Sequence, residues 1–184
     1  MMLSNPPLVL DSDIISTFAH INRLDILEYL YSERLLVLDE VFWEVSRSPK
    51  VGGVLSNTMN RGCFRQDKLN LLGEDGMEYA RLVDRGNLGK GEAAVLAYTR
   101  YRGGTVGSSN IRDVLLYCEN HDLPLLATRP IVYDAYCHKI ITLAEACKIW
   151  TAMQDRTRLP NKSFEEVVYH FTGREGGILG KQRY

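Results

Sequence analysis

Acidic side chains stand at several positions in this sequence where they could bind a metal ion. Asp11 ends an apolar run, and Asp13 follows two residues later. Glu44 lies in the segment after a second apolar run, and Glu92 lies near the start of a predicted helix. Clustered carboxylates repel one another unless a cation lies among them, and hard divalent cations prefer oxygen ligands. These acids therefore predict a site for Mg²⁺ or Mn²⁺.

A site of this kind favours one class of reaction. A divalent ion lowers the pKa of a bound water molecule and stabilises negative charge on a phosphate group. Hydrolysis of phosphodiester bonds is therefore the reaction that these residue types indicate. Basic residues near the predicted strand ends are candidates for contacts with substrate phosphates. They are Arg47, Lys50, Lys90, Arg112 and Arg129.

Each of these side chains also has a purely structural interpretation. Asp13, Asp39 and Asn110 could be helix N-caps, and Glu92 could stabilise the positive end of a helix dipole. Each basic residue could be a solvated surface charge. Asp11 fits such an interpretation least well, because an acid that ends a buried strand loses hydration unless another group pairs with it.

Alternating strands and helices predict the elements that position these residues. Such alternation is typical of a parallel sheet with right-handed crossovers and helices on both faces. Strands are predicted at residues 8–11, 35–38, 105–108 and 123–128. Helices are predicted near residues 14–19, 22–31, 39–45, 74–85, 90–101, 110–118, 131–137, 143–155 and 164–171. We expect a three-layer α/β/α fold with a central parallel sheet of four to five strands.

Local signals predict several helix ends and one loop. Asn22 has the capping-box spacing before a helix, with Asp25 three residues later, and Asp39 could cap the helix that follows the second strand. The segment 46–62 is rich in Ser, Pro, Gly and Asn, so we expect a loop there and a mobile flap. The Gly-rich and charged tail at 173–184 is predicted to be loose.

Length and composition indicate one domain. The chain has 184 residues, and we expect a single domain over 1–172, with its core at 8–150 and a helical closure at 151–172. Lys and Arg number 22 against 23 Asp and Glu, for a formal net charge of −1, which excludes the basic bulk charge of a histone-like protein. The four cysteines lack metal-binding spacing. Neither a signal peptide nor a membrane span is expected, so we predict a cytoplasmic protein.

The order and spacing of these motifs resemble the PIN-domain family over roughly residues 8–150. The segment "LVLDSDIISTF" resembles its first strand and helix, "VFWEV" its next acidic helix, and "LGKGEAAVLAY" its central helix. The segment "TVGSSNIRDVLLYCENHDLPLLAT" resembles the following strand, acidic turn, helix and strand. The later segment "LPNKSFEEVVYHF" resembles the closing helix of many bacterial and archaeal members.

The resemblance implies a metal-dependent nuclease, often a ribonuclease, and many small prokaryotic members are toxins held inactive by an antitoxin. It assigns Asp11 and Glu92 to the metal, Glu44 as a third acid, and Ser12 as support for the first. The family's fourth acid aligns with Asn110, which carries no charge. Asp113, one helical turn further on, could substitute for it or could instead form a capping box with Asn110, and Asp13 could also compensate. The implied partners are RNA, an antitoxin protein and a second copy in a homodimer.

Two other functions are compatible with the sequence. Loss of the fourth acid at Asn110 favours a PIN fold with weak or no catalysis, which would bind RNA or protein. The segment "DSD" at residues 11–13 also loosely resembles phosphatases and dehalogenases that use a nucleophilic aspartate. Those enzymes require a hydroxyl residue to close the loop, whereas Ile14 and Ile15 follow Asp13 here.

Overall fold

A computed structural model describes residues 6–154 and 162–172 of the chain. A single parallel sheet has the order β3-β2-β1-β4-β5. Its strands are β1 (Leu8–Leu10), β2 (Leu35–Leu38), β3 (Arg65–Asp67), β4 (Thr105–Gly107) and β5 (Leu125–Leu126). The α/β class and the parallel sheet are therefore confirmed, with five strands. The predicted loose tail and part of the predicted closing segment lie outside the described residues.

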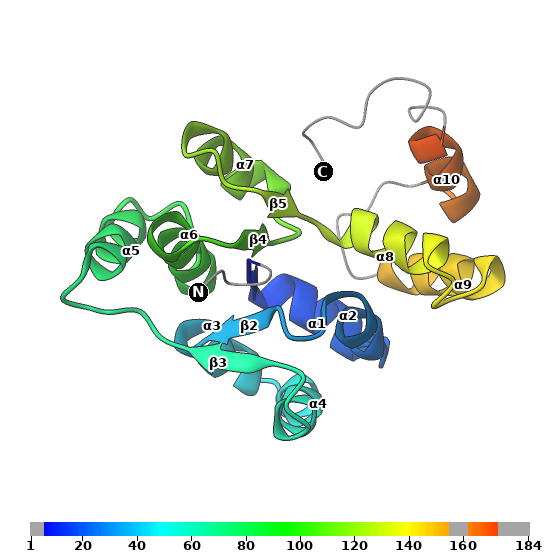
Figure 1. Ribbon diagram of the computed structural model, residues 1–184, viewed down its shortest axis with the longest axis horizontal. Coiled ribbons are helices and arrows are strands. Elements are labelled where there is room, and N and C mark those ends of the chain that lie inside the picture. The colour runs from blue at the N-terminus through cyan, green and yellow to red at the C-terminus, as the bar shows by residue number, and fades with distance from the viewer. Residues whose placement is uncertain (1–5, 155–161, 173–184) are drawn as a thin grey trace.

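Helices lie on both sides of the sheet (Figure 1). They are α1 (Ser12–His20), α2 (Asp25–Tyr31), α3 (Asp39–Ser46), α4 (Pro49–Asn60), α5 (Glu74–Asp84), α6 (Lys90–Arg102), α7 (Ile111–Asn120), α8 (Thr128–Cys137), α9 (Leu143–Gln154) and α10 (Phe164–Thr172). Figure 1 shows α5, α6 and α7 on one side of the strands and α1, α2, α8 and α9 on the other. None of these helices is long and apolar enough to cross a membrane.

The strand order places the end of β1 at the middle of the sheet edge. From β1 the chain builds β2 and β3 on one side, and then crosses to build β4 and β5 on the other. The strand order therefore reverses between β1 and β4, and open α/β sheets bind ligands beyond the carboxyl ends of the strands at such a point. The backbone N–H of Asp11 donates to the carbonyl of Gly107 at 2.8 Å, which ties the two strand ends together.

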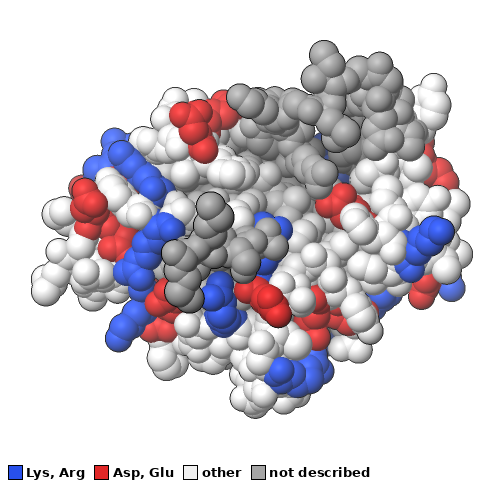
Figure 2. All heavy atoms as spheres, in the orientation of Figure 1, with Lys and Arg blue, Asp and Glu red and all other residues white. Residues whose placement is uncertain are grey.

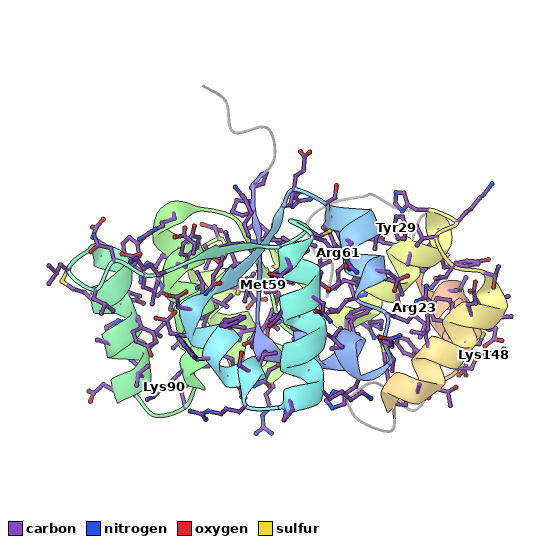
Figure 3. All side chains as sticks on the ribbon, turned by 90° about the horizontal axis from the view of Figure 1, so that it is seen from below. Arg23, Tyr29, Met59, Arg61, Lys90 and Lys148 are labelled. Atoms are coloured by element: carbon purple, nitrogen blue, oxygen red, sulfur yellow. The ribbon has the colours of Figure 1, made fainter. Side chains whose placement is uncertain are left out.

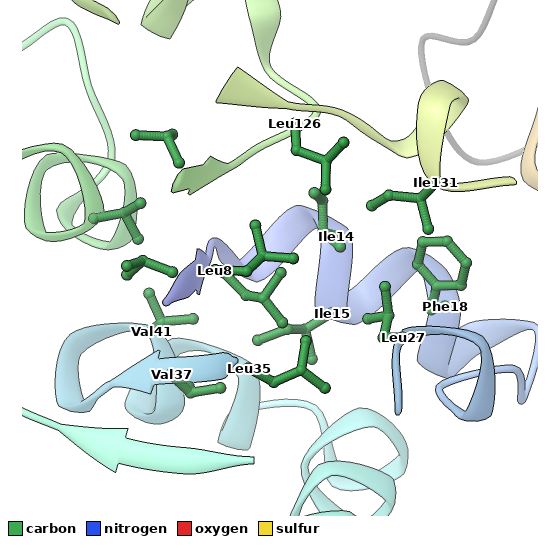
Figure 4. Packing of buried hydrophobic residues seen from close by; sticks show 14 of the residues in the cluster. Leu8, Ile14, Ile15, Phe18, Leu27, Leu35, Val37, Val41, Leu126 and Ile131 are labelled. Carbon is green, nitrogen blue, oxygen red and sulfur yellow. The ribbon is translucent and has the colours of Figure 1, made fainter. Parts of the chain in front are cut away.

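The core forms where buried strands meet the apolar face of α1. The side chains of Ile14, Ile15 and Phe18 on that helix are fully buried. Figure 4 shows these residues beside Leu8 of β1 and side chains from β2, α2, β5 and α8. The central helix α6 lies across β1, β2 and β4, and nearly all its middle residues are buried. This packing fixes the start of both helices at the carboxyl edge of the sheet.

The loop predicted at residues 46–62 is wrong, because most of this segment is the helix α4. Val51 and Leu55 of this helix are buried, and Gly52 lies against the preceding helix. A Cβ on Gly52 would lie 3.0 Å from the Cα of Ser46. Glycine here permits the close approach of α3 and α4, and the predicted flap does not exist.

Two predicted caps are also wrong. Asn22 has a positive φ of 55° and lies in the turn before α2, where its side chain caps nothing. The carboxylate of Asp25 instead pairs with Arg23, with 3.0 Å between Nε and Oδ1. Asp39 is the first residue of α3 rather than its cap, and its carboxylate accepts a hydrogen bond from Gln66 at 2.7 Å.

The edge strand β3 was not predicted from the sequence. Arg65 and Gln66 are exposed and Asp67 is half-buried, so the strand has no apolar run to mark it. It forms because its backbone continues the ladder of β2. Short, polar edge strands of this kind discourage pairing with other chains.

Acidic and basic side chains mix on the face of the molecule seen in Figure 2. Figure 2 shows Lys and Arg interspersed with Asp and Glu on one face of the molecule. Beneath the surface, the buried carboxylate of Glu78 joins α5, α6 and α7. It accepts hydrogen bonds from Arg81, from Arg100 at 2.9 Å and from the hydroxyl of Tyr117 at 2.6 Å. These partners lower the pKa of Glu78 to about 2, with the hydrogen bond from Arg81 as the largest cause.

We expect Glu78→Gln to lower the free energy of unfolding at neutral pH by roughly 1–3 kcal/mol, the usual range for charge-assisted hydrogen bonds. The pKa of Glu78 lies below the ordinary value of 4.5. Its contribution is therefore present above pH 4.5 and is lost as the pH falls towards 2. Urea unfolding at pH 7 and pH 3 measures this, with the exposed Glu119→Gln as control. An equal loss at both pH values would contradict the prediction.

Candidate metal centre

Asp11 is buried at the carboxyl edge of the sheet, with 1% of the residue's surface exposed. It occupies the N-cap position of α1, and its Oδ1 accepts a hydrogen bond from the backbone N–H of Ser12 at 2.7 Å. Its Oδ2 accepts a longer hydrogen bond from the hydroxyl of Ser108 at 3.3 Å. Both oxygens are thus held in place by neutral donors, and the negative charge itself has no positive partner from these groups.

Two further acids lie beside Asp11. Carboxylate oxygens of Asp11, Asp13 and Glu92 all lie within 4.8 Å of one another. Asp13 comes from the first turn of α1 and Glu92 from the first turn of α6. The edge of the sheet therefore joins acids that are about 80 positions apart in the sequence. This group could hold a metal ion, because its oxygens are the ligands that hard divalent cations take.

Glu44 reaches the same group from α3. The hydroxyl of Ser12 donates to Glu44 Oε1 at 2.8 Å. A Cβ on Gly91 would lie 2.8 Å from Glu44 Oε2 and 3.2 Å from Asp11 Oδ1. Both carboxylates therefore approach the bare Cα of Gly91 in the first turn of α6. The partial positive charge at that end of the helix favours acids there.

Asn110 connects the group to a fifth acid. Its side-chain amide donates to Glu92 Oε1 at 2.5 Å and to Asp113 Oδ2 at 2.7 Å. The side chain makes no capping bond to α7, although Asn110 occupies the N-cap position. The other oxygen of Glu92 accepts from the backbone N–H of Gly89 at 2.9 Å, so the predicted helix-start role of Glu92 holds beside its place in the cluster.

The surroundings of Asp11 disfavour its charged form. Burial raises its pKa well above the ordinary value of 3.8, and the negative charges of Asp13, Glu92 and Glu44 raise it further. The hydrogen bond from Ser12 acts in the opposite direction. Among the described residues, no Lys or Arg forms an ion pair with Asp11, Glu44 or Glu92.

The other buried acids of the described chain, unlike Asp11, form ion pairs with arginine. Asp75 pairs with Arg102, with 2.7 Å between the nearest atoms, and Glu78 pairs with Arg81 and Arg100. Asp11 is the third acid of this kind and lacks such an arginine. A buried carboxylate surrounded by carboxylates requires a proton or a cation. The oxygen-only donor set fits a divalent cation.

The predicted phosphate-binding residues lie around this edge, at varying depth. Arg47 ends α3, Lys90 begins α6 and Arg112 lies in the first turn of α7, all with exposed side chains. Figure 3 shows Lys90 at one end of the molecule, where α6 begins. Arg129, in the first turn of α8, is half-buried. Lys50 donates to the carbonyl of His20 at 3.3 Å, which holds it between α4 and α1.

Two residues of the site were not assigned from the sequence. Ser108 is buried and donates to Asp11, and its hydroxyl also accepts from the backbone N–H of Asn110 at 3.2 Å. Gly91 provides the space for two carboxylates. The sequence offers signals for both: a hydroxyl residue at the end of the strand next to β1, and a glycine directly before the helix acid Glu92.

Comparison of the chain with protein-family models and with curated proteins finds no match. Function must therefore be argued from the site itself.

Asp11→Asn should raise the thermal stability of the metal-free protein at neutral pH, because it removes an uncompensated buried charge. The folded protein holds the pKa of Asp11 above its ordinary value. Wild-type stability from this group is therefore present at low pH and is lost as the pH rises through the raised pKa. Thermal unfolding of wild type and Asp11→Asn in EDTA, from low pH to pH 7, measures the difference in stability. A variant less stable than wild type at pH 7 would contradict it.

The same variant should lose stabilisation by metal. Wild type should gain about 2.7 kcal/mol when Mn²⁺ is present at 100 times its Kd, whereas Asp11→Asn should gain far less.

Gly91→Ala should weaken metal binding roughly 10-fold or more, the range seen when groups around a metal site are disturbed. The new methyl group would displace the carboxylate of Glu44 and crowd that of Asp11. The fold should persist, since Gly91 lies in a helix and alanine favours helices. Gly53→Ala is the matched control, because a Cβ there meets nothing within 4 Å. Equal Mn²⁺ affinity of the two variants would refute this role of Gly91.

Proposed function

We propose that this chain is a Mg²⁺- or Mn²⁺-dependent nuclease that hydrolyses phosphodiester bonds of RNA. One observation carries the proposal: within the described part of the chain, the charges that act most strongly on the buried carboxylate of Asp11 are those of acids, at the strand-order reversal of a parallel sheet. The other buried acids of the described chain have arginine partners. A divalent cation would offset this repulsion, and its coordination positions not taken by carboxylates could accept a water molecule or a phosphate oxygen.

Each residue has a part in the proposed reaction. Asp11, Asp13 and Glu92 would hold the metal, and Glu44 would complete the group from α3. When bound, the metal would supply an activated water molecule and charge stabilisation at the scissile phosphate. Ser12 fixes the carboxylate of Glu44 by its hydroxyl and that of Asp11 by its backbone N–H. No covalent intermediate with the protein is required.

Exposed basic side chains would position the RNA backbone. Arg47, Lys90 and Arg112 stand on three helices that end or begin at the acidic edge. Cations around an acidic centre offset its repulsion of a polyanion and direct phosphate groups to it. Arg129 is a further candidate from α8.

The resemblance to PIN domains supports the same function and extends it. We infer membership of that family from the motif order, which agrees with the positions of Asp11, Glu44 and Glu92 at one sheet edge. The family analogy adds three proposals: action as the toxin of a toxin–antitoxin pair in the cytoplasm, inhibition by an antitoxin protein, and assembly as a homodimer.

A second candidate function is an RNA- or protein-binding PIN fold with weak or no catalysis. Asn110 supports it, because its amide holds both Glu92 and Asp113 at the place where the family pattern has an acid. A hydrogen-bond donor there competes with a metal for the same carboxylate oxygens. Such a module would bind RNA without metal and would not cut it.

The residues after Asp13 argue against the phosphatase or dehalogenase interpretation, because the buried Ile14 and Ile15 lie where those enzymes require a hydroxyl residue. Phosphoenzyme trapping at Asp11 would restore that interpretation.

We expect the full chain to cut labelled single-stranded RNA with Mn²⁺ or Mg²⁺ and not with EDTA. Asp11→Asn and Glu92→Gln should each lower the cleavage rate at least about 100-fold, because loss of a ligand should cost as much as the larger effects seen around metal sites. Gel analysis of the products measures the rate.

Glu119→Gln is the matched control for Glu92→Gln, since Glu119 is an exposed acid in the last turn of α7. It should cut RNA at the wild-type rate. Uncut RNA in every metal, with a folded protein, would favour the silent binding module. Cleavage that survives in EDTA would remove the metal from the reaction.

A further inference from the structure

Trp43 is an exposed aromatic side chain beside the candidate metal centre. Its side chain lies on α3 and 67% of its surface is exposed, whereas Trp150 is 1% exposed. Its ring meets the half-buried ring of Phe42 edge-on, with centroids 6.0 Å apart and planes at 72°. Phe42 therefore supports one edge of the indole, and much of the indole surface stays open to solvent. Tryptophan is seldom exposed to this degree, because burying it releases a large apolar area.

The indole lies next to the acids of the site. Glu44 follows Trp43 directly in α3, and its two oxygens contact the hydroxyl of Ser12 and the space over Gly91. A nucleic-acid strand bound at the acidic centre would therefore pass close to Trp43. This position excludes a role for Trp43 in the core of the domain.

The surroundings of Trp43 are polar and carry both charges rather than being apolar, because by helical spacing Asp39, Glu40 and Arg47 share its face of α3. No other large hydrophobic residue of α1, α3 or α4 is exposed, so the indole is not the centre of an apolar patch of the size that protein interfaces use. Arg47 lies four residues after Trp43 in α3, and such residues share one helix face. Lys90 is exposed at the start of α6, which packs against α3.

An exposed ring with an arginine on its helix face, next to an acidic site that is proposed to bind phosphate, matches one way in which proteins hold single-stranded nucleic acid. Basic groups follow the phosphates while aromatic rings stack on bases. Every unpaired base offers a flat face to an indole, whereas bases in a duplex have both faces covered.

We propose that Trp43 stacks on an unpaired base of the RNA strand that enters the metal centre. The role rests on the proposed function, since it names how the substrate of that site is held. It makes Trp43 a binding residue that selects single strands, while Asp11, Asp13, Glu44 and Glu92 remain the acidic group.

The two tryptophans make the test direct, because Trp150 is buried and its indole N–H donates to the carbonyl of Lys162 at 2.8 Å. Fluorescence of the wild-type full chain is titrated with a single-stranded RNA oligonucleotide in EDTA, where cleavage is not expected. The strand should quench the emission of Trp43, and a duplex of the same sequence should quench it far less.

Substitutions separate stacking from other contacts. Trp43→Ala should weaken binding of labelled single-stranded RNA roughly 5- to 100-fold, as the usual range for one base–aromatic stack predicts. Trp43→Phe keeps a ring and should retain most of the affinity. Tyr29→Ala is the matched control, because Tyr29 is 73% exposed on α2 and lies far from Lys90 in Figure 3. It should bind as wild type does.

Each outcome decides a separate question. Wild-type affinity of Trp43→Ala for single strands, or equal quenching by duplex, would overturn the stacking role. Unchanged RNA affinity with an altered oligomeric state, seen by sedimentation, would assign Trp43 to a protein contact instead. Trp43-dependent binding without any cleavage in Mn²⁺ would remove the nuclease proposal and leave the stacking role standing. Cleavage at the wild-type rate by Trp43→Ala would overturn the stacking role and leave the nuclease proposal standing.

Discussion

The site depends on one unfavourable arrangement, the burial of the Asp11 carboxylate with no Lys or Arg paired to it among residues 6–154 and 162–172. A charged group enclosed by protein loses several kcal/mol of hydration, and neutral hydrogen-bond donors restore only part of it. Asp13, Glu92 and Glu44 add repulsion, and together with burial they raise the pKa of Asp11. In the metal-free protein, the charged form of Asp11 is therefore electrostatically unfavourable, and a divalent cation would stabilise it. Asp75 and Glu78 are not destabilised in this way, because each has an arginine partner.

The rest of the fold keeps this arrangement in place. The central strand β1 carries Asp11 to the edge of the sheet, and the hydrogen bond to Gly107 fixes its distance from β4. The start of α6 brings Glu92 and the bare Cα of Gly91 to the same point. Packing of α1 and α6 on the sheet stabilises both helix ends. Repulsion among the acids could therefore separate the helix ends only by disrupting the core. Stability of the core is thus used to hold a site that is itself unfavourable.

Function follows from what surrounds the acids. The side-chain amide of Asn110 joins Glu92 to Asp113, which lowers the repulsion between these two acids. A metal bound by Glu92 would compete with this hydrogen bond. Trp43 and Arg47 lie on one exposed face of α3, beside Glu44. If the proposed metal is bound, the acids together with Arg47 and the exposed ring of Trp43 would suit an extended polyanion with unpaired bases better than a small phosphate ester.

Much of this could be predicted from the sequence, because short apolar runs ending in acids mark buried parallel strands wherever they occur. The runs at 8–11 and 35–38, the helix from Lys90 and the acids themselves depend only on local pattern. Tertiary structure alone decided the rest. Segment 46–62 forms α4 since Gly52 permits contact with α3, and β3 forms because β2 offers a ladder to a polar segment. Whether Asp11 has a counter-charge depends on which side chains meet it across about 80 residues or more, and no local pattern contains that information.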